Sequence, residues 1–469
     1  MAHAPTALTR DQLGRLRDTF PGDIITPSDD AYDTARRLWN AVHDRRPAVI
    51  VRPQTRAQVA TAVRFARELD LALAVRSGGH SPSGHSACDG GLVVDLSHMR
   101  GATVDPATRT ARVNGGALLG ELDVAAQAHG LVCPTGVIGH TGVAGLTLGG
   151  GVGRLQRNFG LTIDSLRAVE LVTADGRFVR ASATEEPGLF WGMRGAGWNF
   201  GIATAFEFEL HPFGPDLHRG LRTYPAAAAH GVWQVFEDYA ATAPETVSMI
   251  FGIAPAEAEA ANDRAGVSVG DPVVLVSFNH SGPAETVERD TAGLRRGPEP
   301  LAVTEGSQPY LEVQGAYDLV YGWGHRSFIK GLYANTFRPE ALDELIDLVA
   351  DGPAGGSFGV TAQGGAIARV DDDAMAYTGR AARFDLSADV AWEDPADDTA
   401  NESWVRRAMA TVEPDAVEGR YANENADSGP AETRLMYGDA KLARLAALKR
   451  TWDPDNVFRL NHNVEPASD

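Results

Sequence analysis

RSGGHSPSGH, at residues 76–85, places two glycines directly before a histidine and follows the apolar run LALAV, which is typical of a buried strand. Consecutive glycines after a strand allow backbone conformations closed to other residues, and they let amide N–H groups converge on an anion without a blocking side chain. Residues 77–79 are therefore a candidate cradle for a pyrophosphate. A single Gly-Gly pair is by itself more often a tight turn, so this interpretation needs support elsewhere in the chain.

Two further glycine-rich segments supply that support. They read PTGVIGHTGVAGLTLGGGVG at residues 134–153 and RGAGWNFGIATAFEF at residues 194–208. The GGGVG run has the wrong spacing and context for a Rossmann fingerprint, and no Gly-Lys-Ser/Thr follows any of the loops as a P-loop requires. Three such loops indicate one shared, phosphate-rich ligand that is held in another way.

Composition bounds the class of protein and its partners. The 469 residues exceed one ordinary domain, so we expect two. Hydrophobic residues make up 43% and charged residues 22%, as in soluble globular proteins, and no apolar run approaches the length of a membrane span. The net charge of −20 repels nucleic-acid phosphates and anionic lipid surfaces, so we expect neither as a partner.

Cysteine and histidine usage bounds the chemistry. Cys88 and Cys133 are too few for a disulfide framework or a thiolate metal site, and the 13 histidines show no HExxH motif or ligand cluster, so no metal is expected. The beginning, MAHAPTALTRDQLGRLRDTF, lacks the basic region and apolar core of a secretory signal. We therefore expect a cytoplasmic protein.

Periodicity predicts the elements of the first half. A helix over residues 56–70 leads into a strand at 71–76, and 91–99 is a further strand. Hairpins are predicted at 103–113, around a Pro-containing turn, and at 168–182, around Asp-Gly.

After HPF at residues 211–213 the predicted helices become longer and the predicted strands lie farther apart. We therefore place a domain boundary near residue 215. Strands are expected in PVVLVSF at 272–278 and in FGVTAQGGAIARV at 358–370. The chain ends in an amphipathic helix, stopped by Asp453-Pro454, and an asparagine-rich tail.

Five stretches, in this order and at this spacing, carry a resemblance to a known family. They are PSDDAYDTARRLWN at 27–40, VRSGGHSPSGHSACDGGLVVDLSHM at 75–99, HTGVAGLTLGGGVGRLQRNFGLTIDSL at 140–166, NFG at 199–201 and DPDNVFRLNHNVEP at 453–466. Over almost its whole length the chain resembles the FAD-linked oxidases with a vanillyl-alcohol-oxidase or PCMH-type flavin domain, in the branch of 6-hydroxynicotine oxidase-like and berberine-bridge-enzyme-like proteins.

The resemblance implies an α+β fold and FAD as the cofactor. A PCMH-type FAD-binding domain of two α+β subdomains is expected at residues 1–215. A substrate-binding domain, with a large antiparallel sheet covered by helices, is expected at 216–420, and residues 421–469 are expected to return to the FAD domain.

The resemblance also assigns a role to the histidine after the glycines. In the family, the histidine of the RxGGH motif is joined covalently to the 8α-methyl of the flavin, and the match falls on His80. Closure of the glycines on the FAD pyrophosphate would aim this imidazole at the dimethylbenzene edge, and a neutral imidazole nitrogen is nucleophilic near physiological pH. His85 is the rival for the attachment, and the plainer alternative for His80 is a hydrogen-bonded loop histidine.

Together, the glycine loops and the resemblance predict a set of FAD contacts. These are Arg76, Ser77, Gly78, Gly79, His80, Ser81, Gly84, His85, His140, Thr141, Gly142, Gly145, Gly149, Gly150, Asn199, Gly201, Ile202, Asn461 and Asn463. Some relatives carry a second bond, from a cysteine to flavin C6, at a place that aligns with Ile138 here. Cys133 lies about five residues too early for this, so we read it as structural and expect one covalent bond.

Five residues are candidates for the substrate side of the flavin. His140 matches a position beside the isoalloxazine in relatives, although it could merely hold its loop. Tyr421 and Asn423 are expected on an extended strand that points both side chains the same way, where a buried tyrosinate could accept the substrate proton. Their alternative is an ordinary strand face. Gln363 and Tyr377 are weaker candidates from the second domain.

Two departures from the family pattern limit the substrate prediction. Relatives often have an acidic side chain near Gln363, and its absence puts direct carboxylate catalysis in doubt. Arg154 stands where many relatives have an aromatic residue. An arginine at the pocket mouth would favour an anionic or carbonyl-bearing substrate, but a surface ion pair is equally expected.

The resulting hypothesis is an FAD-dependent oxidase, flavinylated at His80, that takes a hydride from a small alcohol, amine or phenol and passes the electrons to O2, giving H2O2. We expect a monomer or homodimer that acts in secondary metabolism. The alternatives are an oxygenase or oxidative cyclase of natural-product biosynthesis on the same fold, and a non-catalytic FAD-binding module.

Overall fold

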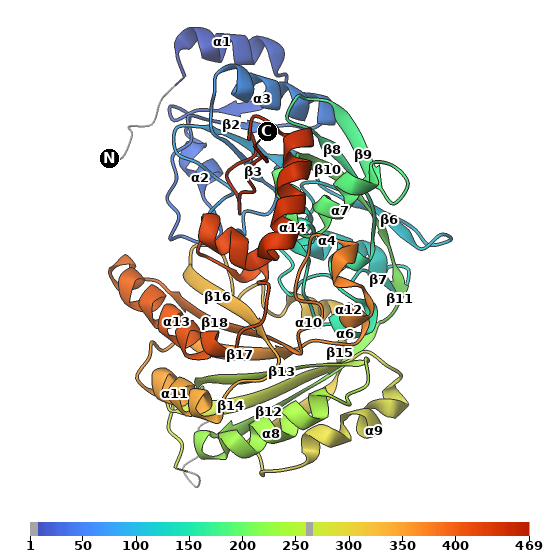
Figure 1. Cartoon of the computed structure of the whole chain (residues 1–469), viewed down its shortest axis with the longest axis vertical. Helices are drawn as coiled ribbons and strands as arrows, with labels where there is room; N and C mark the ends of the chain where they lie inside the picture. The colour runs from blue at the N-terminus through green and yellow to red at the C-terminus, as the bar shows by residue number, and fades with distance from the viewer. Residues whose placement is uncertain (1–7, 259–265, 469) are drawn as a thin grey trace.

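The computed structural model describes residues 8–258 and 266–468. Figure 1 shows the N-terminal half of the chain lying together with the last helix and tail, while a large sheet and its helices form the other end of the molecule. Within the described residues, no helix combines the length and apolar character needed to cross a membrane.

The first of the sheets has four strands in the order β1–β2–β4–β3, and only β1 runs antiparallel to its neighbour. The strands are β1 (Asp23–Ile25), β2 (Val49–Arg52), β3 (Leu73–Arg76) and β4 (Leu92–Asp95), with helices α1 (Arg10–Thr19), α2 (Tyr32–Arg36) and α3 (Arg56–Glu68) around them. Helix α3 packs here because Val59, Val63 and Ala66 form a buried stripe against Val49 and the sheet core. The predicted helix and both strands are confirmed.

The second sheet has five antiparallel strands in the order β5–β6–β10–β8–β9. They are β5 (Ala102–Asp105), β6 (Thr110–Asn114), β8 (Leu166–Val172), β9 (Phe178–Ser182) and β10 (Ile202–Glu209), packed against α4 (Leu119–Gln127), α5 (Val143–Gly149) and α7 (Pro187–Ala196). Both predicted hairpins are confirmed. The β8–β9 turn needs its glycine, since Gly176 has φ +78°. A small sheet pairs β7 (Leu131–Val132) with β11 (His211–Pro212).

The third sheet has seven antiparallel strands in the order β15–β12–β14–β13–β17–β18–β16. They are β12 (Asp216–Pro225), β13 (Val247–Pro255), β14 (Pro272–His280), β15 (Ala302–Pro309), β16 (Arg326–Ala334), β17 (Ser357–Ala362) and β18 (Phe384–Trp392). Helices α8 (Ala229–Ala240), α11 (Pro339–Ala350) and α13 (Asp398–Val412) cover one face with an apolar core. In Figure 1, α8 and α11 lie on the side away from the other sheets.

The two faces of this sheet differ sharply in burial. On β13, Phe251 is fully buried against the helices, whereas its neighbour Ile250 is 40% exposed. Strand β17 alternates in the same way along its whole length, with Phe358 and Val360 buried and Gly359 and Thr361 partly exposed. We call this partly exposed face, which lies on the other side of the sheet from the helices, the cleft face.

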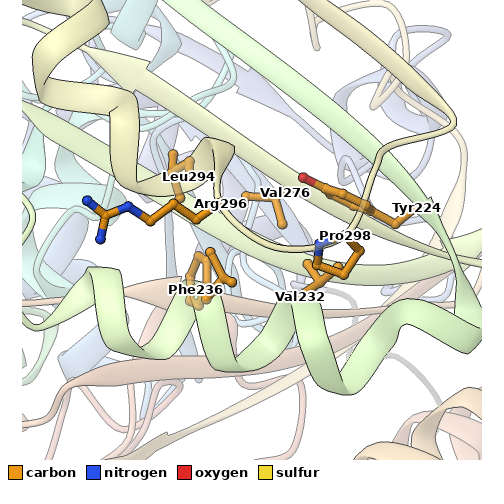
Figure 2. A pocket seen from close by; sticks show the side chains of 8 residues that line it. Tyr224, Val232, Phe236, Val276, Leu294, Arg296 and Pro298 are labelled. Atoms are coloured by element: carbon orange, nitrogen blue, oxygen red, sulfur yellow. The ribbon is translucent and has the colours of Figure 1, made fainter.

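Figure 2 shows a different space, on the helix-covered side of the same sheet. It is lined by Tyr224, Val232, Val235, Phe236, Val276, Leu294, Arg296 and Pro298. Most of these side chains belong to the apolar core between α8 and the strands. This space is therefore a gap in the packing, on the opposite face from the cleft.

Helix α14 (Pro430–Trp452) carries the chain back to the N-terminal sheets, as Figure 1 shows. The predicted stop at Asp453 is confirmed, and a buried ion pair of 2.7 Å between Lys449 and Asp453 fixes it. Lys449 also donates to the carbonyls of Asn199 and Phe458, both at 2.8 Å. These contacts anchor the tail beside the third glycine-rich segment.

Two strand predictions are wrong, the first in part and the second entirely. The strand expected over 358–370 ends at Ala362, because Gly364 and Gly365 have φ of +89° and +57° and turn the chain into the short helix α12 (Ala366–Arg369). Tyr421 and Asn423 do not lie on a strand. Residues Ala422–Glu424 form a 3-10 turn, closed by a 3.1 Å hydrogen bond from Glu424 N–H to the Tyr421 carbonyl.

The remaining short helices are α6 (Gln156–Phe159), α9 (Val287–Thr291) and α10 (Tyr310–Gly315). The predicted α+β class, with a large antiparallel sheet covered by helices, is confirmed. Whether the chain divides into domains at residues 215 and 420 stays a prediction.

Candidate active site

The first two glycine-rich segments meet backbone to backbone. A Cβ added to Gly78 would lie 2.1 Å from the amide nitrogen of Gly142, and one added to Gly142 would lie 2.3 Å from that of Gly78. Ser77 fixes its loop by donating from Oγ to the Gly115 carbonyl at 2.8 Å. The contact requires glycine on both sides, and it brings residues 77–79 and Thr141 together.

This contact places His80 against His140. Nε2 of His80 lies 2.7 Å from Nδ1 of His140, and the His80 ring stacks on Trp39 with centroids 4.8 Å apart and an interplanar angle of 16°. The rings of His80 and Trp323 meet edge to face, with centroids 6.2 Å apart. Burial, and then the neighbouring His140, lower the pKa of His80 to about 3. The imidazole of His80 is therefore neutral at physiological pH.

Hydrogen bonds connect the His80–His140 pair to the next loop. Nε2 of His140 lies 3.3 Å from the Asp318 carbonyl, which can only accept, so this nitrogen carries a proton. His80 contacts His140 through Nε2, and its other ring nitrogen, Nδ1, makes no hydrogen bond within the described residues, so it is available as a nucleophile. Asp318 further accepts from the Gly139 N–H at 2.6 Å, which holds the loop.

The run of glycines after α5 approaches the predicted substrate-side residues. The phenolic oxygen of Tyr421 accepts hydrogen bonds from the N–H groups of Gly151 and Val152, both at 3.1 Å, and from Nδ2 of Asn423, also at 3.1 Å. A Cβ on Gly150 would lie 2.7 Å from the ring of Tyr377. Tyr421, Asn423 and Tyr377 are thus brought together, although by a turn rather than by a strand.

Three donors around one phenolic oxygen favour its anionic form. Burial acts the other way and more strongly, so the pKa of Tyr421 is raised well above its usual value, and the Val152 and Gly151 amides and Asn423 offset part of that rise. Tyr421 therefore rests as a phenol with the donors for a phenolate already in place. Such preorganised donors stabilise charge at the moment it forms.

A second phenol pair connects this group to the large sheet. The hydroxyls of Tyr333, on β16, and Tyr377 lie 2.6 Å apart, and the Tyr377 and Tyr421 rings meet edge to face at 6.2 Å. Burial raises the pKa of both Tyr333 and Tyr377 well above the usual value. The cleft face thus touches the glycine-rich segment through three tyrosines.

Sequence reasoning missed the carboxyl groups on the cleft face. Asp385 and Asp389 on β18 share this face, and Glu424 reaches it from the turn after Tyr421. The position of a Cβ on Gly331 lies 3.6 Å from a Glu424 carboxyl oxygen and 3.7 Å from Oδ1 of Asp385. The signal was present in FDLSADVAW, where acidic residues four apart share one face of an otherwise apolar strand.

Gln363 lies just beyond β17 on the same face, and its N–H donates to the Arg383 carbonyl at 2.8 Å. Its side chain is 3% exposed, and Nε2 has no hydrogen-bond partner within the described part of the chain. Gln363 therefore lies where its side chain would contact a bound ligand. The acidic side chains of this region come from the neighbouring strand β18.

Unsatisfied polar atoms test whether the fold suits FAD. Among the described residues, buried polar atoms of Trp198, Asn461, His462 and Asn463 have no partner. Asn461 also donates to the Trp198 carbonyl at 3.1 Å, so these groups are neighbours beside the glycine loops. Leaving such an atom unpaired costs about 1–3 kcal/mol, and a ligand rich in donors and acceptors would satisfy them. The residues present therefore fit FAD.

Other predicted contacts have clear partners inside the protein. Arg76 makes a buried 2.5 Å ion pair with Asp95, and Asn199 pins the tail by accepting from the Val464 N–H at 3.0 Å. Gly201 packs closely on Leu171 and Val172, and Ile202 belongs to the core of the first sheet. For these residues the structure shows a role in holding the loops.

The remaining predicted positions are more peripheral. Ser81 Oγ accepts from the His85 N–H at 3.2 Å, and Gly84 packs against the ring of His43. His85 packs on His462 instead of the His80 pair, and burial lowers its pKa to about 3. Gly145 and Gly149 lie on α5, where a Cβ on Gly149 would meet Asn423 Oδ1 at 2.5 Å, whereas Gly145 has open space.

Cys133 and Arg154 both lie inside the protein. Cys133 is fully buried in the core of the second sheet, and burial raises the pKa of its thiol far above the usual value. Arg154 is 9% exposed, stacks over Tyr317 at 4.8 Å and donates to the Val313 carbonyl at 3.3 Å. The surface ion pair considered for Arg154 is therefore wrong. In the described residues, no cluster of three His, Cys, Asp or Glu side chains could hold a metal.

Comparison with known proteins agrees with this geometry. Residues 47–182 match the FAD binding domain family, and residues 420–465 match the berberine and berberine-like family. (R)-6-hydroxynicotine oxidase of Paenarthrobacter nicotinovorans is 31% identical over 96% of this chain and 97% of its own length.

Two solved structures share the fold. The crystal structure of 6-hydroxy-D-nicotine oxidase from Arthrobacter nicotinovorans, 28% identical, covers 96% of this chain and 98% of its own with a TM-score of 0.83. The berberine-bridge-enzyme-like protein 1 of Physcomitrella patens, 25% identical, covers 98% and 99% with a TM-score of 0.87. The chain therefore belongs to the FAD-linked oxidoreductases of the vanillyl-alcohol-oxidase/PCMH type, in the branch of the 6-hydroxynicotine oxidase-like and berberine-bridge-enzyme-like oxidases.

Proposed function

We propose that this protein is an oxidase that carries FAD covalently on His80, removes a hydride from a small alcohol, amine or phenol, and returns the electrons to O2 as H2O2. The observation that carries the proposal is the His80–His140 hydrogen bond of 2.7 Å on a Trp39 platform. It holds a neutral imidazole with one nitrogen free at the junction of two glycine loops.

A bound flavin would supply the hydride acceptor and the route to O2. His80 would tether it, the loops of Ser77–Gly79 and Thr141–Gly142 would hold its phosphates, and Asn461 and Asn463 would contact it from the tail. The protein's own part in the reaction is to position the substrate on the cleft face, to keep water out and to take its proton. Tyr421 is the candidate for that last task, which would require its phenolate, the form that the three donors around its oxygen favour.

An anaerobic titration with a library of alcohols, amines and phenols tests the function. Loss of the yellow flavin absorbance, followed on re-aeration by one H2O2 per flavin, is the expected result. Incorporation of label from ¹⁸O2 into the product would instead indicate an oxygenase or cyclase. A flavin that no library member bleaches would contradict catalysis and favour a binding module.

A further inference from the structure

Arg154 is a buried cation for which the described residues supply no anion. It is 9% exposed, and its Nε has no hydrogen-bond partner in the part of the chain that the structure describes. The groups that act most strongly on its charge are Tyr317, Arg219 and Tyr310, none of which is a carboxylate. A buried charge is costly unless an opposite charge and hydrogen bonds compensate it. The unused donor of Arg154 therefore indicates an acceptor that a ligand would supply.

A second cation lies close to the first. Arg219 is a partly exposed residue of β12, and among the described residues it forms no ion pair. Its neighbour Gly220 faces the helix-covered core, where an added Cβ would lie 2.3 Å from the ring of Phe278, so Arg219 faces the cleft side. Burial lowers the pKa of Arg154, and the positive charge of Arg219 lowers it further. We call Arg154 and Arg219 the arginine pair, and their mutual repulsion would be relieved by an anion bound between them.

Carboxyl groups of the surrounding elements have other partners or other places. Glu305, on the adjacent strand β15, lies on the helix-covered side, where it pairs with Arg222 at 2.9 Å and Arg295 at 2.8 Å. Asp123, on α4, is buried and accepts from Oγ1 of Thr135 at 3.0 Å, and burial raises its pKa to about 7. Three strands separate β12 from the acidic residues of β18. None of these groups is paired with either member of the arginine pair.

The loops of the candidate active site also position Arg154. It comes two residues after Val152, whose N–H donates to the oxygen of Tyr421 at 3.1 Å. The ring over which its guanidinium stacks, that of Tyr317, directly precedes the residue whose carbonyl lies 3.3 Å from Nε2 of His140. The arginine pair is therefore connected to the glycine run on one side and to the contact with His140 on the other.

We propose that the arginine pair binds a carboxylate of the substrate, so that the preferred substrates are alcohols, amines or phenols that also carry an acid group. This rests on the proposed oxidase function and narrows it. A guanidinium group matches a carboxylate in geometry, and hydrogen bonds between charged partners are roughly twice as strong as neutral ones. The carboxylate would accept from Nε of Arg154 and neutralise both cations, while the rest of the molecule extends along the cleft face toward Tyr421.

Benzoate and benzamide are a matched pair of probes, because they have nearly the same shape and differ in charge. Neither is an alcohol, an amine or a phenol, so oxidation does not consume them during the measurement. Calorimetric titration of the flavin-loaded protein at neutral pH is expected to show benzoate binding at least about tenfold tighter than benzamide. Arg154→Gln and Arg219→Gln should each weaken benzoate binding by roughly tenfold and change benzamide binding by less than about threefold.

Arg295→Gln is the control, because this arginine pairs with Glu305 on the helix-covered side of the same sheet. It should change neither titration. Since Arg219 is partly exposed, its variant keeps the proposal testable even if Arg154→Gln fails to fold.

Equal binding of the two probes, no binding of benzoate, or a preference for benzoate that survives in a folded variant of either member of the arginine pair would overturn the proposal. The oxidase function is tested separately, by whether any library member bleaches the flavin.

Discussion

The two faces of the seven-stranded sheet are built from alternate residues of the same strands and have opposite characters. On β18, Phe384, Leu386 and Ala388 are completely buried against the helices, while Asp385 and Asp389 face the cleft. The helix side has the composition of a core, whereas on the cleft side Oδ1 of Asp385 and Nε2 of Gln363 are buried without a hydrogen-bond partner among the described residues. Stability is concentrated on the helix side, and we propose that the substrate contacts the other face.

Neighbouring residues on β13 offer the sharpest test of this division. Phe251→Ala removes a fully buried ring from the helix side and should lower the free energy of unfolding by about 3–5 kcal/mol. Ile250→Ala, on the 40% exposed cleft side, should cost less than about 1 kcal/mol. Urea denaturation measures both, and similar losses for the two variants would contradict the comparison.

Tyr421→Phe, in contrast to the β13 variants, should have its main effect on turnover. The variant removes the oxygen that accepts from Gly151, Val152 and Asn423, so flavin bleaching by substrate should slow by roughly 100-fold. The rate is measured per flavin in folded protein, because the orphaned amides also lower stability. Trp392→Phe, at the helix side, is the control. An unchanged rate and pH profile for Tyr421→Phe would exclude this residue as the proton acceptor.

The pH dependence of stability gives a smaller effect with a definite sign. The folded protein holds a proton on Glu424 up to about pH 7, whereas the unfolded chain loses it near 4.5. Stability from this group is therefore present at low pH and declines as the pH rises across that window. Glu424→Gln should flatten part of the decline, so that its stability relative to wild type increases from pH 5 to pH 8. A parallel pH dependence in both proteins would show that Glu424 is not perturbed.

The sequence predicted the first half of the molecule better than the second. Helix periodicity, turns with Pro or Asp-Gly, and glycine runs are local signals, and they located α3, both hairpins and the loops of His80 and His140. The cleft face depends on which strands become neighbours, and β17 pairs with β13 and β18 at long range. No sequence signal near Gln363 indicates that acidic residues of another strand lie beside it.

The turn at Tyr421 shows a different limit. A strand was expected there because alternating residues would share a face, and the two side chains do meet, with Asn423 donating to Tyr421 at 3.1 Å. A 3-10 turn, rather than a strand, brings the two side chains together, and no strong residue propensity predicts this turn. The cytoplasmic location, the oligomeric state and the place in secondary metabolism stay predictions.

The mass of the denatured protein tests the covalent tether most directly. We predict that wild-type protein, after acid precipitation, stays yellow and shows an intact mass increased by one FAD, and that peptide mapping places the addition on His80. His80→Ala should lose the added mass, while His85→Ala and Cys133→Ala retain it. An unmodified wild-type mass, or a modification that persists in His80→Ala, would contradict the account.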